Sequence, residues 1–130
     1  MKHVGAGTHT VLDLYCVDLD SMTIINNCPE SKDIWNEFMQ KWFATANITC
    51  INTVWHDFDR AGAFTALYLL SESHLSIHTW PEKRYIAIDI FTCGDCDMDY
   101  MVSQLVEYFA PKYKTETKLV RGEMLIDNNT

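Results

Sequence analysis

The sequence predicts an α+β fold, a two-layer sandwich in which helices cover one face of an antiparallel sheet. Three observations support this prediction. The expected elements follow one another in the order β-α-β-β-β-β-α-β. The loops between the four central strands are short, which favours antiparallel pairing of successive strands. The chain has 130 residues and contains no linker, internal repeat or break in composition, so residues 1–130 fit one domain.

A strand and a helix are expected first. Residues 11–17 alternate between two sets of side chains, as a strand with two different faces does. Ser31 is expected to cap a helix that ends near Asn47. The apolar positions with the spacing of one helix face are Ile34, Trp35, Phe38, Trp42 and Phe43. We expect the aromatic side chains of this face to lie in the core.

Four strands, a second helix and a last strand complete the predicted fold. The four strands are rich in β-branched, aromatic or aliphatic residues and span residues 48–55, 64–70, 75–80 and 85–92. Asp97 or Asp99 is expected to cap the second helix, and Pro111 ends it. Residues 115–121 are expected to form the last strand.

Charge and composition argue against two classes of partner. The net charge is −8, and the ten lysines and arginines are dispersed, which argues against nucleic-acid binding. No apolar run reaches the roughly 20 residues of a membrane helix, and no signal-peptide segment is recognisable, so we expect a cytoplasmic protein with no membrane partner. Five scattered cysteines are expected to stay thiols, and Cys16, Cys28 and Cys50 are expected to pack in the core.

Nucleophiles and bases are concentrated in residues 70–82 and 89–94. A four-residue hairpin loop between these strands sets Ser73 opposite Thr92 and beside Cys93. A serine, a thiol and two imidazoles therefore converge on one hairpin.

Several sites can be drawn from these residues alone. A zinc-binding module without enzymatic activity would use two imidazoles and two thiolates, from His74, His78, Cys93 and Cys96. Residues 93–96 match a redox dithiol before a helix, although the strand order lacks the parallel crossover of thioredoxin-like folds. A hydrolase triad would use Ser73, His78 and Asp89, without the Gly-x-Ser-x-Gly elbow. The residue types leave these alternatives open.

The same hairpin resembles the processing site and active site of a known family. Residues 71–82 and 91–94 are closely similar to those of the bacterial and archaeal form of S-adenosylmethionine decarboxylase. The similarity includes Glu-Ser-His at 72–74 and His-Thr-Trp-Pro-Glu at 78–82. It also includes the intervals of five residues from Ser73 to His78 and of twenty to Cys93. Weaker likeness extends from Gly7-Thr8-His9 through Arg121-Gly122.

The resemblance implies a proenzyme that cuts itself between Glu72 and Ser73. The products would be a β chain of residues 1–72 and an α chain of residues 73–130. In the family, the serine hydroxyl attacks the preceding carbonyl, and elimination followed by hydrolysis leaves a covalent pyruvoyl group, the cofactor. By resemblance, His78 is the processing base, and Thr65 stands where the family usually has a serine hydroxyl.

The resemblance also implies the reaction and the assembly. The pyruvoyl ketone would form a Schiff base with the α-amine of S-adenosylmethionine and take up the electrons released with carbon dioxide, giving the aminopropyl donor for spermidine. Cys93 is the implied proton donor. Phe58 resembles the aromatic residue that stacks on adenine, with Phe64 in reserve, and Glu72 is a candidate for the ribose or the sulfonium. The family forms homodimers of processed protomers. The alternative substrates are other cationic amino acids, ornithine or arginine.

Two features of spacing carry further expectations. Strand alternation puts Ser73 and His78 on opposite faces of the sheet, which predicts a bend or bulge at the cleavage site. Between Phe58 and Thr65 there is one residue more than the family spacing.

Overall fold

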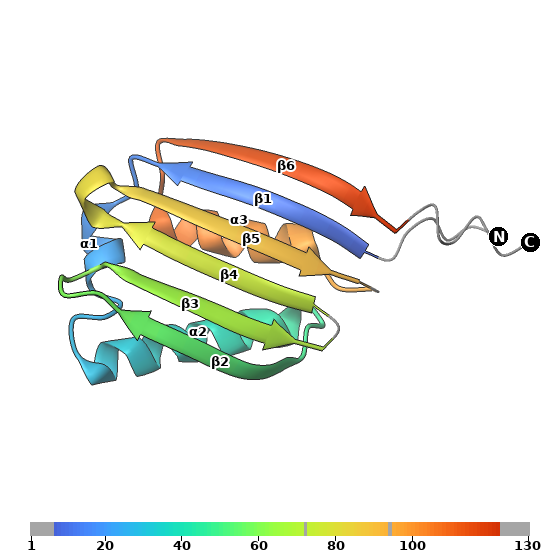
Figure 1. Cartoon of the computed structure of the whole chain (residues 1–130), viewed down its shortest axis with the longest axis horizontal. Coiled ribbons are helices and arrows are strands. Elements are labelled where there is room, and N and C mark those ends of the chain that lie inside the picture. Colours follow the sequence, from blue (N-terminus) through green and yellow to red (C-terminus); the bar gives the residue numbers. More distant parts are fainter. Residues whose placement is uncertain (1–6, 72, 94, 123–130) are drawn as a thin grey trace, which may run out of the picture.

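Six strands form one antiparallel sheet, and the helices pack on one side of it (Figure 1). This computed structural model describes residues 7–71, 73–93 and 95–122. The strands are β1 (Gly7–Tyr15), β2 (Cys50–Asp57), β3 (Phe64–Leu70), β4 (Ser73–Trp80), β5 (Tyr85–Thr92) and β6 (Tyr113–Arg121). The helices are α1 (Leu19–Thr23), α2 (Pro29–Thr45) and α3 (Met98–Phe109), with a 3-10 turn η1 (Pro81–Lys83). The strand order in the sheet is β2-β3-β4-β5-β1-β6.

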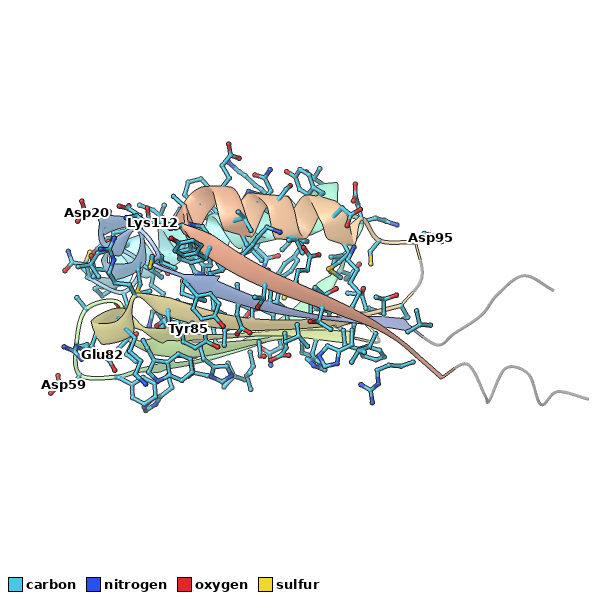
Figure 2. The ribbon with its side chains drawn as sticks, turned by 90° about the horizontal axis from the view of Figure 1, so that it is seen from above. Asp20, Asp59, Glu82, Tyr85, Asp95 and Lys112 are labelled. Carbon is cyan, nitrogen blue, oxygen red and sulfur yellow. The ribbon has the colours of Figure 1, made fainter. Side chains whose placement is uncertain are left out.

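Alternation along the strands gives the sheet a covered face and an open face. On β4, Leu75 and Ile77 are fully buried toward the helices, whereas His74, Ser76 and His78 lie on the other side. Figure 2 shows the helices on one side of the sheet and only side chains on the other. We call the side that no described helix covers the open face.

The core lies between the covered face and helices α2 and α3. Its largest fully buried side chains include Trp35, Phe43, Tyr68 and Phe109, and each contributes roughly 1.5–3 kcal/mol or more through burial. Trp35 Nε1 donates to Tyr68 Oη at 3.1 Å, and Tyr68 Oη donates to Asn36 Oδ1 at 2.8 Å. Burial raises the pKa of Tyr68 far above its usual value, so its hydroxyl stays neutral within the core.

The predicted fold class and order of elements are confirmed, with two short additions, the 3-10 turn η1 and helix α1. Helix α1 has only five residues, too few for an apolar repeat to reveal it in the sequence. Asp18 caps it, because its carboxylate accepts hydrogen bonds from the backbone N–H of Ser21 at 3.1 Å and from its hydroxyl at 2.7 Å.

Several predicted boundaries are wrong by a few residues. The first strand covers Gly7–Tyr15 rather than residues 11–17. Helix α2 begins at Pro29 and not after Ser31, because proline fits the first helical position, where no backbone N–H is needed. It ends at Thr45, and Asn47 follows in the left-handed region with a φ of 63°. Of the two candidate caps of α3, Asp97 is the one that accepts from the Tyr100 N–H, at 3.0 Å.

The prediction of core side chains also needs correction. Phe38 is 39% exposed, because it lies at the margin of the buried stripe of α2, where its ring stacks on Trp42 at 6.0 Å. Cys16 and Cys28 are exposed rather than packed, since they follow β1 and precede α2 instead of facing the sheet. Cys50 is half-buried. None of the helices in the described part of the chain is long and apolar enough to cross a membrane.

Candidate active site

Ser73 and Cys93 lie together at one end of the central hairpin. The predicted pairing of Trp80 with Tyr85 is confirmed, and the β4–β5 ladder continues to His74 opposite Phe91, one residue short of the expected pair of Ser73 with Thr92. Ser73 begins β4, and its hydroxyl donates to the Ser71 carbonyl at 3.0 Å. Cys93 follows β5 directly and is half-buried. Ser73 and Cys93 therefore lie at the same end of the hairpin, on neighbouring strands.

His78 and Thr65 form a second group near the other end of the same strands. They are directly paired across β3 and β4, and Thr65 Oγ1 lies 3.1 Å from His78 Nδ1. A strand rises about 3.3 Å per residue, so the five residues from Ser73 to His78 separate them by roughly 17 Å. Within one protomer, the structure does not bring these two side chains together.

The expected bulge at the cleavage site is not present in β4. β4 pairs with β3 over residues 73–78 and with β5 over residues 74–80, in each case without a register shift. Ser73 and His78 therefore lie on opposite faces of the sheet, as strict alternation predicts. Glu72, the residue before the predicted cut, lies outside the described residues.

Phe58 lies at the His78 end of the molecule. It follows β2, its side chain is 51% exposed, and its ring meets that of His56 edge-on at 4.7 Å. Figure 2 shows Asp59, its neighbour in sequence, at the opposite end from Asp95, which lies between Cys93 and Cys96. The candidate residues thus form two groups, which we call the Ser73 group (Ser73 and Cys93) and the His78 group (Thr65, His78 and Phe58).

Phe64 is not available to contact a ligand. Its side chain is fully buried, and its ring stacks on Trp55 at 4.4 Å. The reserve role given to Phe64 is therefore excluded, and Phe58 is the exposed aromatic residue of this segment.

The alternative sites drawn from the sequence are not assembled. His74 and His78 both lie on the open face but are four residues apart on one strand, roughly 13 Å, too far to bind one zinc ion. Among the residues that the structure describes, no three His, Cys, Asp or Glu side chains are grouped to hold a metal. Asp89 pairs with His9 and not with His78, so the hydrolase triad is not formed. All six described strands are antiparallel, unlike those of thioredoxin-like folds.

Sequence reasoning missed one cluster beside the Ser73 group. His9 on β1 lies 3.3 Å from Asp89, measured from Nε2 to Oδ1, and its ring centroid is 6.4 Å from that of His74. Phe91 lies between the two histidines in the sheet, 6.2 Å from His9. Only the pairing of β1 with β5 brings these residues together, and the local pattern of the sequence carries no signal for that pairing.

At its His78 end the open face carries stacked aromatic rings. Tyr85 stacks on Tyr15 at 5.3 Å and on Trp80 at 5.2 Å. Burial, a hydrogen bond donated to Asp13 and the negative charge of that carboxylate raise the pKa of Tyr85 well above its usual value. Tyr85 therefore stays protonated and bonded to Asp13 at neutral pH.

Comparisons with known proteins extend over nearly the whole chain. A family model described as S-adenosylmethionine decarboxylase matches residues 8–122. An S-adenosylmethionine decarboxylase proenzyme of Aquifex aeolicus is 39% identical over 122 residues, covering 90% of this chain and 84% of that one. One of Clostridium botulinum is 34% identical over 120 residues, covering 92% and 97%. The crystal structure of the adenosylmethionine decarboxylase from Aquifex aeolicus is similar with a TM-score of 0.75 and 28% identity, covering 92% of this chain and 93% of that chain.

Proposed function

This chain belongs to the S-adenosylmethionine decarboxylase family, and from that premise we propose that it decarboxylates S-adenosylmethionine with a pyruvoyl group made from Ser73. The observation that carries the proposal is the position of Ser73 at the start of β4, at the same end of the hairpin as Cys93, within a family match over residues 8–122. The product would be S-adenosylmethioninamine, the aminopropyl donor for spermidine.

The first step is cleavage of the chain between Glu72 and Ser73. The Ser73 hydroxyl attacks the carbonyl of residue 72, and the peptide bond is exchanged for an ester. Elimination then releases a carboxylate on the first fragment and leaves dehydroalanine at position 73, which rearranges and takes up water to give the pyruvoyl group and ammonia. Overall, one water is consumed and one ammonia is released. The Ser73 side chain suits this role because it lies at the edge of a turn, where its hydroxyl donates to the carbonyl of Ser71.

The residues around the finished site have separate tasks. When present, the pyruvoyl group supplies a carbonyl that withdraws electrons from the substrate, as pyridoxal phosphate does. Cys93 returns a proton to the carbon that loses carbon dioxide, and its position directly after β5, at the end of the hairpin where β4 begins, supports this role. A reducing compartment such as the cytoplasm keeps this cysteine in the thiol form that the step requires. Glu72 is the cleavage site, and it is also a candidate contact for the ribose or the sulfonium.

Processing needs a base near Ser73, and we propose that the partner protomer of a homodimer supplies it. The base is His78, held by Thr65 at 3.1 Å, but within one chain it lies roughly 17 Å along β4 from Ser73. In this dimer the two-fold axis lies parallel to the sheet and perpendicular to the strands. The open faces of the two copies then pack against each other, and the strands of one copy point in the opposite direction to those of the other. This arrangement brings the His78 group of each copy over the end of the other sheet at which Ser73 begins β4. Ser73 lies at the end of its strand, and for cleavage its hydroxyl has to turn from the covered face toward the partner.

The open face has the composition that such packing requires. Its exposed apolar side chains lie on four strands and include Val54, Leu67, Leu69, Trp80 and Leu119. Leu67 is 47% and Leu69 52% exposed, although both belong to an inner strand of the sheet. An apolar surface of this extent on an inner strand favours burial against a second protein surface.

The same packing gives Phe58 a role in binding. In one protomer it lies at the far end from Ser73, because it follows β2 at the edge of the sheet where β3 begins; in the exchanged arrangement it would stand near the partner's pyruvoyl site. Its half-exposed ring is available to stack on adenine, a contact that contributes about 0.5–1.5 kcal/mol beyond burial. An adenosyl substrate uses this contact, whereas ornithine and arginine do not.

The choice of substrate is tested by measuring carbon dioxide release from S-adenosylmethionine, ornithine and arginine side by side. We expect turnover of S-adenosylmethionine alone. Turnover of ornithine or arginine without S-adenosylmethionine would overturn the substrate and leave the pyruvoyl chemistry intact. The matched control is Ser73→Ala, which cannot form the pyruvoyl group and releases no carbon dioxide from any of the three.

A further inference from the structure

The loop that presents Phe58 is held closed by its own backbone. Phe58 N–H donates to the Ala63 carbonyl at 2.9 Å, Arg60 N–H to the Phe58 carbonyl at 2.8 Å, and Ala63 N–H to the Arg60 carbonyl at 3.2 Å. We call residues 58–63 the β2–β3 loop. These bonds fix the shape of the loop, but they do not fix its position relative to the rest of the molecule.

The side chain of Asn26 joins this loop to the helical layer. Its Oδ1 accepts a short hydrogen bond from the Gly62 N–H, and its Nδ2 donates to the Ala63 carbonyl at 3.2 Å. The same Nδ2 donates to Asp57 Oδ1 at 3.2 Å. One amide group thus bonds to the residue before the loop and to two residues near its end.

Asp57 is held in place independently of Asn26. Trp55 Nε1 donates to its Oδ1 at 2.7 Å, and Lys32 Nζ lies 3.0 Å from its Oδ2. Burial opposes ionisation of Asp57, but the hydrogen bonds from Trp55, Lys32 and Asn26 outweigh it and hold its pKa below the usual value. The carboxylate is therefore a fixed, charged acceptor for Asn26 at neutral pH.

The far side of the loop rests on α1 and β4. Gly62 has a φ of 87°, and a Cβ there would meet the Thr23 Cα at 3.1 Å. The buried Thr79 hydroxyl donates to the Gly62 carbonyl and accepts from the Phe64 N–H at 2.9 Å. Asn26 and Thr79 hold Gly62 from two sides. Asn26 accepts from the N–H of Gly62, and Thr79 donates to the carbonyl of the same residue.

We propose that Asn26 is a positioning residue for the adenosyl-stacking ring of Phe58. Without its amide, the Gly62 N–H and the Ala63 carbonyl lose their side-chain partner, and the loop gains freedom at the point where it meets α1. Substrate binding must then order Phe58, and the conformational entropy lost in that step weakens the binding of the substrate. This inference rests on the proposed function, since it takes Phe58 as the residue that stacks on adenine.

The test compares Asn26→Ala, Phe58→Ala and the double variant in steady-state decarboxylation of S-adenosylmethionine. We expect Asn26→Ala to raise KM about 2- to 10-fold, the range for loss of one aromatic stack, with kcat within about twofold of wild type. The double variant should have the KM of Phe58→Ala alone, because Asn26 acts only through that ring. Asn27→Ala, which changes the exposed neighbouring asparagine, is the matched control and should leave both constants unchanged.

A second readout isolates the adenosyl part of the substrate. Competitive inhibition by 5′-methylthioadenosine, which has no amino-acid portion, should weaken by the same factor as KM in Asn26→Ala. If Asn26→Ala only lowered the global stability of the protein, the amount of active enzyme would fall and the inhibition constant would stay unchanged. If Asn26→Ala does not fold, Asn26→Leu gives the same test, because it keeps the volume of the side chain, adds no charge beside Asp57 and loses every hydrogen bond that the amide makes.

The outcomes separate the inference from the proposed function. Phe58→Ala without effect on KM or inhibition would contradict the proposed stacking role, and the inference would fall with it. A raised KM in Phe58→Ala with none in Asn26→Ala would overturn the inference alone. Additive effects in the double variant would also overturn it, because they would show that Asn26 acts independently of Phe58.

Discussion

Mixing two inactive variants tests whether the processing site is shared between protomers. Ser73→Ala removes the nucleophile, and His78→Ala removes the base. The two side chains are about 17 Å apart along β4, whereas proton transfer needs contact at about 3 Å. Each variant alone should therefore remain uncut. In a mixed dimer, however, one of the two sites combines Ser73 from one chain with His78 from the other.

The expected yield follows from random pairing of two equally expressed chains. About half of the dimers are mixed, and each mixed dimer contains one intact site. About half of the His78→Ala chains should be cut, and no Ser73→Ala chain should be cut. With a different affinity tag on each variant, co-expression followed by gel electrophoresis and intact mass measurement gives these fractions directly. If no His78→Ala chain is cut in the mixture, the reasoning that places the base on the partner is refuted.

Three further predictions concern chemistry, pH and packing. Cys93→Ser should still be cut at Ser73, but its rate of carbon dioxide release should fall about 10²- to 10⁴-fold, because a hydroxyl is a poorer proton donor than a thiol. Equal losses in the rate of cleavage and in the rate of decarboxylation would contradict this role. Asp57 has a lowered pKa in the folded state, so its contribution to stability is present above its ordinary value of 3.8 and is lost as pH falls through the lower folded value. The difference in urea unfolding free energy between wild type and Asp57→Asn should therefore shrink below about pH 4, and a constant difference down to pH 2.5 would contradict it. Ile77→Ala should cost about 2–5 kcal/mol, because Ile77 is fully buried under the helices, and a loss below 1 kcal/mol measured in the same way would contradict the packing.

The central strands could be predicted because their residues alternate and their loops are short. Strands β3 and β5 have the predicted bounds, and the four-residue loop of residues 81–84 fixes the pairing of Trp80 with Tyr85. That register alone also puts the start of β4, with Ser73, and the end of β5, before Cys93, at the same end of the hairpin. Local pattern is sufficient here because each of these features depends on residues close together in the chain.

Features that depend on distant contacts could not be predicted. The cluster of His9 with Asp89 joins residues 80 positions apart, and Asn26 bonds to a loop more than 30 residues later. Helix α1 is too short for a periodic signal. Strand alternation in the sequence puts Ser73 and His78 on opposite faces, and this predicts a local bulge. The pairing of β4 with its neighbours is regular instead. We therefore propose that the base comes from a second copy of the chain.

The mass of the C-terminal fragment of the purified protein tests the central claim most directly. The account predicts two fragments, residues 1–72 and residues 73–130. The second should be lighter by one ammonia than the same fragment beginning with serine, and borohydride should reduce its ketone. Ser73→Ala treated identically should give one uncut chain. A wild-type protein that remains whole, or a fragment that begins with unmodified serine, would contradict the claim that Ser73 becomes the cofactor.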